Sequence, residues 1–460
     1  MFERYHIALA DVPGRCHPVP KFEILRADNC ANCGKCERAC VYGVHKRSEQ
    51  DPRKMADPVN SLCKNCFRCI AECPQRALTM MLSEEYRSLG RGIWTSQRIV
   101  TIWSEAESGR IPVFGAGYRG PFAGSGYDGM WTDMSEIVRP TRDGIHGREY
   151  ISTSVDIGRK PDALEFGDGG ALRTKMPPII EQPVPVVLDV ARLRAVTDGM
   201  MEGFARAAKR LQCLMMAPAN SLPTQSGLNG SLVPVYPEGS DVSAITVPDG
   251  VRMVEVGLER IPKGDLRRFR KNNPSVVLGF RLRAGPDIDR RVLDLVRAGA
   301  DAVHILFDEE GNEESGDPPR HSRDSLRAVH KALVSKAVRD EITVIAGGGI
   351  AAAEHVPKTI ICGADVVAIE RALLIALECR NCITCSLASC PANLSSASPE
   401  WIEGRVCNMV GAWRDQLLEV LGAMGLREAR RLRGELGRAI FFEDMERESF
   451  AGIEGGGSNA

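Results

Sequence analysis

The 460-residue chain lacks several features that would assign it to a broad class of protein. It has no window of about 18 uninterrupted apolar residues, so no membrane span is expected. Its formal net charge is only −1, which gives no overall attraction to nucleic acid. Residues 1–14 include acidic side chains and no apolar core, unlike a secretory signal peptide. These absences favour a cytoplasmic protein that binds neither nucleic acid nor the interior of a membrane.

Cysteine, in contrast, is abundant, with 16 residues in the chain. A disulfide scaffold is not expected, because the chain is long and most cysteines stand at the spacing of iron–sulfur ligands. Two runs each read C-x2-C-x2-C-x3-C, and Pro74 follows the second, as in bacterial ferredoxins that hold two [4Fe-4S] clusters. The eight predicted ligands are Cys30, Cys33, Cys36 and Cys40 in the first run and Cys63, Cys66, Cys69 and Cys73 in the second.

The fourth cysteine of each run usually crosses to the other cluster in such ferredoxins. The prediction is therefore one cluster on Cys30, Cys33, Cys36 and Cys73, and a second on Cys63, Cys66, Cys69 and Cys40. Zinc is the alternative ligand, because paired C-x2-C units also bind zinc. Zinc needs only four thiolates per site and gives no reason for a doubled four-cysteine run, so the pattern favours clusters and single-electron transfer.

Composition and spacing divide the chain into five regions. We expect a ferredoxin-like α+β domain at 22–85, a glycine- and aromatic-rich connector at 86–150, a barrel at 151–397, C-terminal helices at 398–450 and a disordered tail at 451–460. The connector contains a G-x-G-x-x-G pattern at Gly115–Gly120. Pro121 follows in place of an amphipathic helix, so a nicotinamide site is not expected there.

Short apolar runs alternate with helical stretches from about residue 180 to 376, which predicts a parallel sheet with crossover connections. Eight such units predict a (β/α)8 barrel, with a doubly wound sheet as the alternative. A helix is also expected from Ser398 to Met424, and another from about Leu426. The strand candidates are 184–190, 212–218, 232–236, 252–257, 276–282, 302–307, 342–347 and 365–369, with helices at 196–211, 287–298 and 322–338.

A glycine-rich turn follows the seventh predicted strand, where phosphate-binding barrels hold their phosphate. Backbone amides of such a turn can approach a phosphate closely. Because a one-electron module precedes the barrel, FMN is the predicted ligand, since a flavin links one- and two-electron steps. The alternative is a glycine-rich turn in an empty barrel. The candidate cofactor-binding residues are Gly347, Gly348, Gly349 and Ile350, with Glu370 and Arg371 after the eighth strand.

A third cysteine group follows the barrel, at Cys379, Cys382, Cys385 and Cys390-Pro391. Without Cys382 its spacing is C-x5-C-x4-C-P, which resembles the [3Fe-4S] motif in the FMN domain of the glutamate synthase family. The glycine turn and the segment 424–434 are also similar to that family, and the added ferredoxin module is similar to its short, archaeal-type members. Cys382 is an extra thiol that could retain a fourth iron, so a [4Fe-4S] cluster is the alternative.

The resemblance implies an oxidoreductase in which ferredoxin-type clusters and the third cluster pass electrons to FMN. The implied reaction is reductive amination of 2-oxoglutarate with ammonia to glutamate. It also implies that Gly348, Gly349, Ile350 and Arg371 lie near the FMN phosphate. The chain begins Met1-Phe2, without the N-terminal cysteine of a glutaminase, so ammonia is expected to be free or supplied by a partner. A redox partner protein, a ferredoxin or another oxidoreductase subunit, is expected as electron donor.

The chain also departs from the family in its substrate segments. Asp308–Asn312 replaces a glycine-rich loop, and the family's strand-five lysine falls at Gly279. Arg281 projects to the same face of that strand and is a candidate to place positive charge near the flavin. A salt-bridged barrel residue is the alternative for Arg281, and a structural role is the alternative for the acid–base candidates His304 and His146. An electron-transfer subunit without amination activity is therefore the alternative function.

Overall fold

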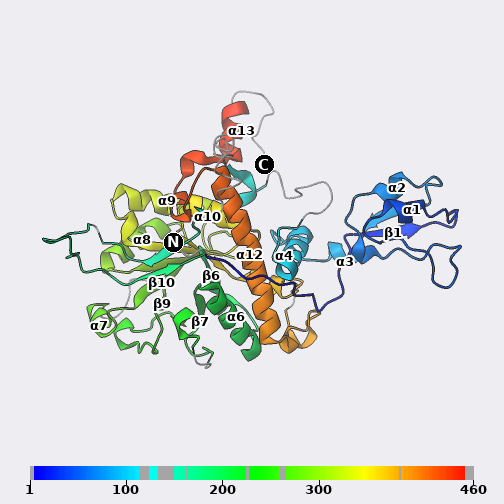
Figure 1. Ribbon diagram of the computed structural model, residues 1–460. Coiled ribbons are helices and arrows are strands. Elements are labelled where there is room, and N and C mark those ends of the chain that lie inside the picture. Colours follow the sequence, from blue (N-terminus) through cyan, green and yellow to red (C-terminus); the bar gives the residue numbers. More distant parts are fainter. Residues whose placement is uncertain are drawn as a thin grey trace.

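The computed structural model describes residues 5–112, 124–132, 150–161, 163–223, 227–259, 266–382 and 385–450. Gly115–Gly120, His146 and the tail 451–460 lie outside the described residues. Figure 1 shows a barrel wrapped by helices, with a small unit that projects from one side of it.

The centre of the molecule is a closed barrel of eight parallel strands (Figure 1). Pairing of the last barrel strand with the first, Val367 opposite Val186, closes the sheet. The predicted (β/α)8 barrel is thus confirmed, and closure excludes the doubly wound alternative. The strands are β6 (Val186–Asp189), β7 (Met215–Pro218), β8 (Leu232–Tyr236), β9 (Met253–Leu258), β10 (Val277–Arg283), β11 (Ala302–Leu306), β12 (Thr343–Gly347) and β13 (Val366–Ile369).

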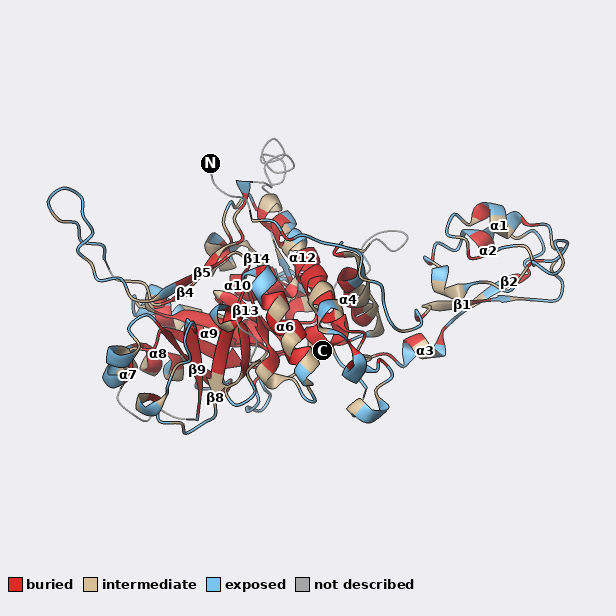
Figure 2. Ribbon diagram, turned by 60° about the horizontal axis from the view of Figure 1, so that its bottom comes forward, coloured by how far each residue is buried: buried red, intermediate tan, exposed pale blue. Residues whose placement is uncertain are grey.

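Burial explains why continuous apolar runs form these strands, since helices cover the outside of the barrel and Figure 2 shows its strands as buried. The surrounding helix α6 begins after Thr197, whose side chain accepts a hydrogen bond from the Met200 amide, and it ends at the left-handed Gln212. The helices that follow the strands are α6 (Asp198–Leu211), α7 (Leu266–Asn272), α8 (Ile288–Ala298), α9 (Ser322–Ser335), α10 (His355–Ile361) and α11 (Arg371–Ala376).

The projecting unit, residues 22–82, contains the first two cysteine runs. Its antiparallel strands β1 (Phe22–Arg26) and β2 (Leu78–Leu82) pack with the short helices α1 (Lys35–Ala39) and α2 (Arg68–Ala71) around a small core of its own. The unit joins the rest of the chain through α3 (Glu84–Arg87) and α4 (Ser96–Ser108). In both Figure 1 and Figure 2 it stands apart from the barrel.

The long helix α12 (Pro399–Ala423) packs against α6 and α4 and also contacts the N-terminal segment at Val12. Its buried Arg405 donates hydrogen bonds to the carbonyl oxygens of Ala376 (2.5 Å), Val12 (3.1 Å) and Trp103 (3.1 Å). Residues far apart in sequence therefore share one guanidinium. As predicted, Ser398 caps the helix, and Gly425 follows its end with a φ of 69°.

The second C-terminal helix does not start near Leu426, so that prediction was wrong. Ser152 donates its backbone N–H to Arg427 and accepts one from Ala429, which holds these residues extended beside residue 152. The next α-helix is α13 (Phe442–Phe450), which follows β14 (Ala439–Phe441). The remaining strands are β3 (Met130–Thr132), paired with β14, and the hairpin of β4 (Val155–Gly158) and β5 (Ile179–Gln182).

Across the described residues, none of the helices has both the length and the apolar character to cross a membrane.

A carboxyl group buried between α4 and α12 gives the fold a predicted pH dependence. Glu105 accepts a hydrogen bond from Trp413 Nε1 (2.9 Å), and burial raises the Glu105 pKa from 4.5 to about 8. The unfolded chain releases this proton at lower pH than the native chain, so stability falls as pH rises from about 4.5 to about 8. Glu105→Gln keeps an acceptor for Trp413 but has no proton to release.

We therefore expect the denaturation midpoint of Glu105→Gln, relative to wild type, to rise between pH 6 and pH 9 in urea titrations. The exposed Glu107 on the same helix provides the control: Glu107→Gln makes the same charge change and should show no such trend. Parallel curves for wild type and Glu105→Gln would contradict the prediction.

Candidate functional site

A cavity of about 720 Å³ lies at the carboxyl ends of the barrel strands. This volume is within the usual range for cofactor and ligand pockets. Its walls come from the segments after β6, β11, β12 and β13, from the connector at Arg91 and Trp94, and from three cysteines of the third run. Because five arginines and only four carboxylates face the cavity, it tolerates an anionic ligand. These residues are Arg91, Arg192, Arg194, Arg283, Arg371, Asp308, Glu309, Glu314 and Glu370.

The glycine turn after β12 borders the cavity through Gly348, Gly349 and Ile350. Gly348 and Gly349 have φ values of 108° and 70°, which side chains rarely adopt. A Cβ atom on Gly348 would lie 2.5 Å from the Phe307 carbonyl oxygen, so only glycine lets the turn pack against the segment after β11. Gly347 lies below the cavity, where a Cβ would be 2.8 Å from Glu370 Oε1.

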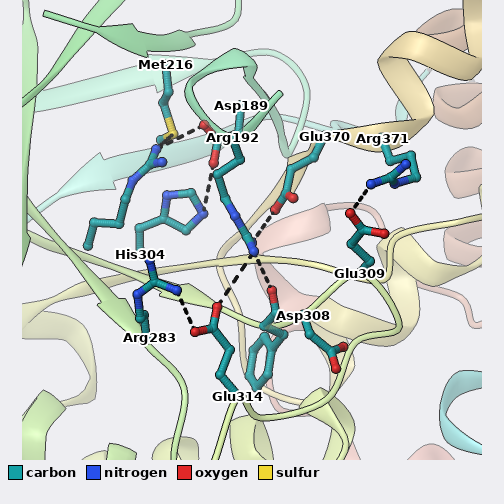
Figure 3. Close-up of polar contacts among 12 residues, drawn as sticks. Asp189, Arg192, Met216, Arg283, His304, Asp308, Glu309, Glu314, Glu370 and Arg371 are labelled. Carbon is teal, nitrogen blue, oxygen red and sulfur yellow. Dashed lines mark hydrogen bonds and ion pairs between the residues drawn. The ribbon is translucent and has the colours of Figure 1, made fainter. Parts of the chain in front are cut away.

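Arg371 starts α11 and faces the cavity beside the glycine turn (Figure 3). Its guanidinium forms an ion pair with Glu309 and donates from Nη1 to Asn381 Oδ1 at 2.6 Å. Asn381 belongs to the third cysteine run, and it is buried. One arginine thus contacts both the acidic segment after β11 and the cysteine run.

Glu370 and Arg192 form a second ion pair at the cavity wall, 2.8 Å between Arg192 Nη1 and Glu370 Oε1 (Figure 3). Arg192 Nη2 also donates to the Phe307 carbonyl at 2.8 Å. Burial raises the pKa of the Glu370 carboxyl. The Arg192 guanidinium lowers this pKa and the Asp189 carboxylate raises it, and the result is a pKa of about 7. This carboxyl can therefore hold or release a proton near neutral pH.

A buried charge cluster lies deeper in the barrel and consists of Asp189, Glu255, Arg281 and His304. Arg281 contacts Asp189 Oδ1 at 3.1 Å and Glu255 Oε2 at 2.9 Å, and His304 Nδ1 lies 3.3 Å from Glu255 Oε1. Burial alone would raise the pKa of Glu255, but the charges of Arg281 and His304 outweigh it and hold the pKa at about 2. Four charged or titratable groups thus share the interior.

Arg281 is therefore a salt-bridged barrel residue, which was the alternative to a place beside the flavin. Neither Arg281 nor His304 is among the described residues that line the cavity. The candidates Gly348, Gly349, Ile350, Glu370 and Arg371 are brought together around it. Sequence reasoning missed Asp189 and Glu255, although a carboxylate inside an apolar strand was a usable signal, because such residues are seldom buried without a partner. Arg192 and Asn381 gave no comparable signal.

The first two cysteine runs approach one another in the projecting unit. Cys40, Cys63, Cys66 and Cys69 line one small cavity, and burial, followed by the nearby thiols of Cys63, Cys40 and Cys66, raises the pKa of Cys69 to about 11. Cys36 and Cys73 pack against the same small core. Cys40 of the first run thus lies beside the second run, and the crossed assignment stays a prediction. Across the described residues, no three histidine, cysteine, aspartate or glutamate side chains converge on the position of one metal ion.

In the third run, Cys379, Cys382 and Cys385 face the large cavity. Burial raises the pKa of the Cys379 thiol, and the nearby thiols of Cys390, Cys382 and Cys385 add to this effect. Together they bring the pKa to about 11. The other three thiols thus interact electrostatically with Cys379, and four thiols in one run are the donor set that an iron–sulfur cluster requires.

The buried charge cluster yields a prediction for stability. Arg281→Met leaves two buried carboxylates without their cation, so we expect a loss of about 3–5 kcal/mol at neutral pH in urea unfolding. The loss should shrink at pH 4, where the unpaired carboxylates take up protons. Arg283→Met, on the same strand but exposed, is the control and should cost less than about 1 kcal/mol. Equal losses of unfolding free energy for the two variants would show that the buried charge cluster contributes no more to stability than an exposed ion pair.

Comparison with known proteins identifies the same region. The family model described as the conserved region in glutamate synthase matches residues 267–427, which include β10 to β13 and the third cysteine run. The archaeal glutamate synthase (NADPH) of Archaeoglobus fulgidus is 26% identical, over 96% of this chain and 98% of the relative. The archaeal-type glutamate synthase (NADPH) of Thermotoga maritima is also 26% identical, over 93% and 96%.

Among solved structures, the flavin-binding domain of baker's yeast flavocytochrome b2 aligns over 67% of this chain and 86% of its own length, at 12% identity and a TM-score of 0.38. The barrel assignment therefore depends on the strand order of this chain itself. The match in the barrel and cysteine run, together with relatives that align along nearly the whole chain, indicates that the chain is a glutamate-synthase-like oxidoreductase.

Proposed function

We propose that this chain catalyses the reductive amination of 2-oxoglutarate with ammonia to glutamate, with FMN in the barrel cavity and three iron–sulfur clusters. The observation that carries the proposal is the shared cavity, which the glycine turn, Arg371 and three cysteines of the third run all border. A phosphate-binding turn and a redox centre at the same cavity are what a flavin supplied with single electrons requires.

The residues present fit the FMN phosphate. Gly348 and Gly349 keep the turn free of side chains, and Arg371 supplies a cation beside it. Arg371 is also paired with Glu309, so phosphate and Glu309 compete for its guanidinium. Bound FMN would supply the conversion between the clusters' single electrons and the two electrons that amination of a carbonyl consumes.

Protons must reach the substrate as well as electrons. Formation of glutamate from 2-oxoglutarate and ammonia consumes two electrons and two protons and releases one water. Glu370, with a pKa of about 7 at the cavity wall, is the proposed proton donor, and Arg192 holds its carboxylate in place after proton release. Arg283 and Arg192 offer cations for the substrate carboxylates.

Arg281 and His304 are proposed to act from beneath the cavity. Both are fixed by Glu255, and His304 Nε2 is buried without a hydrogen-bond partner among the described groups. We propose that they set the shape of the cavity floor, because the carboxylates of Asp189 and Glu255 already compensate the Arg281 charge.

Electrons are proposed to enter at the [4Fe-4S] clusters of the projecting unit. That unit is connected to the third run through Glu85, whose carboxylate pairs with Arg380 Nη1 at 2.8 Å. The relatives' names give NADPH as their reductant. We propose that a redox partner protein delivers such reducing equivalents to the projecting unit.

An electron-transfer subunit without amination activity is the second candidate. The ion pairs of Arg192 with Glu370 and of Arg283 with Glu314 favour it, because they occupy cations that substrate carboxylates would need.

The deciding assay is anaerobic. The full chain is reduced, 2-oxoglutarate and ammonium are added, and flavin absorbance and glutamate are followed together. Flavin reoxidation with stoichiometric glutamate is expected. A fully reduced flavin that ignores both substrates would instead support the electron-transfer subunit.

A pair of variants tests the phosphate site with opposite expected signs. Arg371→Gln removes a charge-assisted contact of about 1.5–3 kcal/mol, so FMN should bind about 10- to 100-fold more weakly. Glu309→Gln frees Arg371 from its competitor, so FMN should bind more tightly.

FMN titration monitored by flavin fluorescence measures both effects. Arg206→Gln, on the outer surface of α6, is the control and should not change affinity. A similar loss of affinity in both cavity variants would remove Arg371 from the proposed phosphate site.

A further inference from the structure

The third cysteine run repeats a local pattern of the first two. Each begins with C-x-N-C: Cys30 to Cys33, Cys63 to Cys66, and Cys379 to Cys382. The asparagine has a left-handed backbone in all three, with φ values of 53° at Asn32, 62° at Asn65 and 53° at Asn381. Asparagine tolerates this conformation better than most residues, so the three segments are the same turn.

The similarity continues beyond the turn. A further cysteine follows after two residues in each run, at Cys36, Cys69 and Cys385. The last cysteine of the third run precedes Pro391, as Cys73 precedes Pro74. The third run is thus C-x2-C-x2-C-x4-C-P, one residue longer than the ferredoxin run in its final spacer. A [3Fe-4S] motif needs no cysteine at position 382, and it needs no turn that directs such a cysteine toward the cluster.

The placement of Cys382 agrees with the pattern. Cys379, Cys382 and Cys385 border the same cavity, and Asn381 between them is buried and held by Arg371. The turn is therefore anchored at Asn381, the residue that precedes Cys382. Cys16 provides a contrast: its Sγ lies 3.8 Å from the Pro391 carbonyl oxygen, but it stands outside the run.

We propose that the third cluster is a [4Fe-4S] cube whose four ligands are Cys379, Cys382, Cys385 and Cys390. This inference rests on the cluster assigned to this run under the proposed function and specifies its nuclearity. A fourth thiolate adds negative charge at the cluster and retains the iron that a three-cysteine site lacks. The centre next to the flavin site would then be of the same type as the two clusters in the projecting unit.

Electron paramagnetic resonance of the full chain, isolated anaerobically without reductant, tests this. An oxidised [4Fe-4S] cluster has paired spins, whereas an oxidised [3Fe-4S] cluster is paramagnetic with one unpaired spin. Wild type is expected to show no three-iron signal. Cys382→Ala should show about one such spin per chain and lose about one iron, while the other three thiolates keep the cluster.

Two further variants make each outcome decisive. Cys385→Ala removes a ligand common to both cluster types and should lose the whole cluster, whereas Cys16→Ala should leave iron content and spectrum unchanged. A three-iron signal in wild type, or Cys382→Ala with unchanged iron and no new signal, overturns the inference. If Cys385→Ala also loses no iron, the cluster assigned under the proposed function fails as well.

Discussion

Closure of the parallel barrel is the constraint on which the candidate site depends. Because β13 pairs with β6, all eight strands point the same way around one axis, and their carboxyl ends meet at one edge. Residues as distant in sequence as Arg192 and Glu370 become neighbours only through this closure. The cavity is therefore a property of the whole ring of strands and not of any single motif.

Closure also creates an electrostatic problem, since the inward positions of a closed barrel are shielded from water. Asp189, Glu255, Arg281 and His304 meet there, and none of them is stable alone in such surroundings. Their mutual pairing makes the interior nearly neutral. The same pairing limits chemistry at this depth, because a guanidinium held by two carboxylates is not available to a substrate. The proposed reactive surface is consequently the layer that lines the cavity, at Glu370, Arg371 and the glycine turn.

The sequence predicted this fold well, because the strands are buried on both faces and read as continuous apolar runs. All eight predicted strands overlap those observed. Pairings across the barrel were not predictable: Arg281 could be placed on an inward face, but its partners Asp189 and Glu255 lie 92 and 26 residues away. The helix expected near Leu426 failed because Ser152, almost 300 residues earlier, holds that segment extended. Local propensity carries no information about such a partner.

The short helix α11 connects the two halves of the site. Its first residue, Arg371, contacts Glu309 and Asn381, and the third cysteine run begins three residues after its last residue, Ala376. Arg405 of α12 donates a hydrogen bond to the Ala376 carbonyl, which fixes the end of α11. Because both ends of α11 are held, the separation between Arg371 and the cysteine run is set by six helical residues and not by a loop. A cluster ligated there and a flavin bound at the turn would keep a constant separation, and electron transfer between fixed centres needs no motion of the barrel. The projecting unit is connected differently, through α3 and the ion pair of Glu85 with Arg380, so the proposed entry of electrons is the step at which this architecture permits movement.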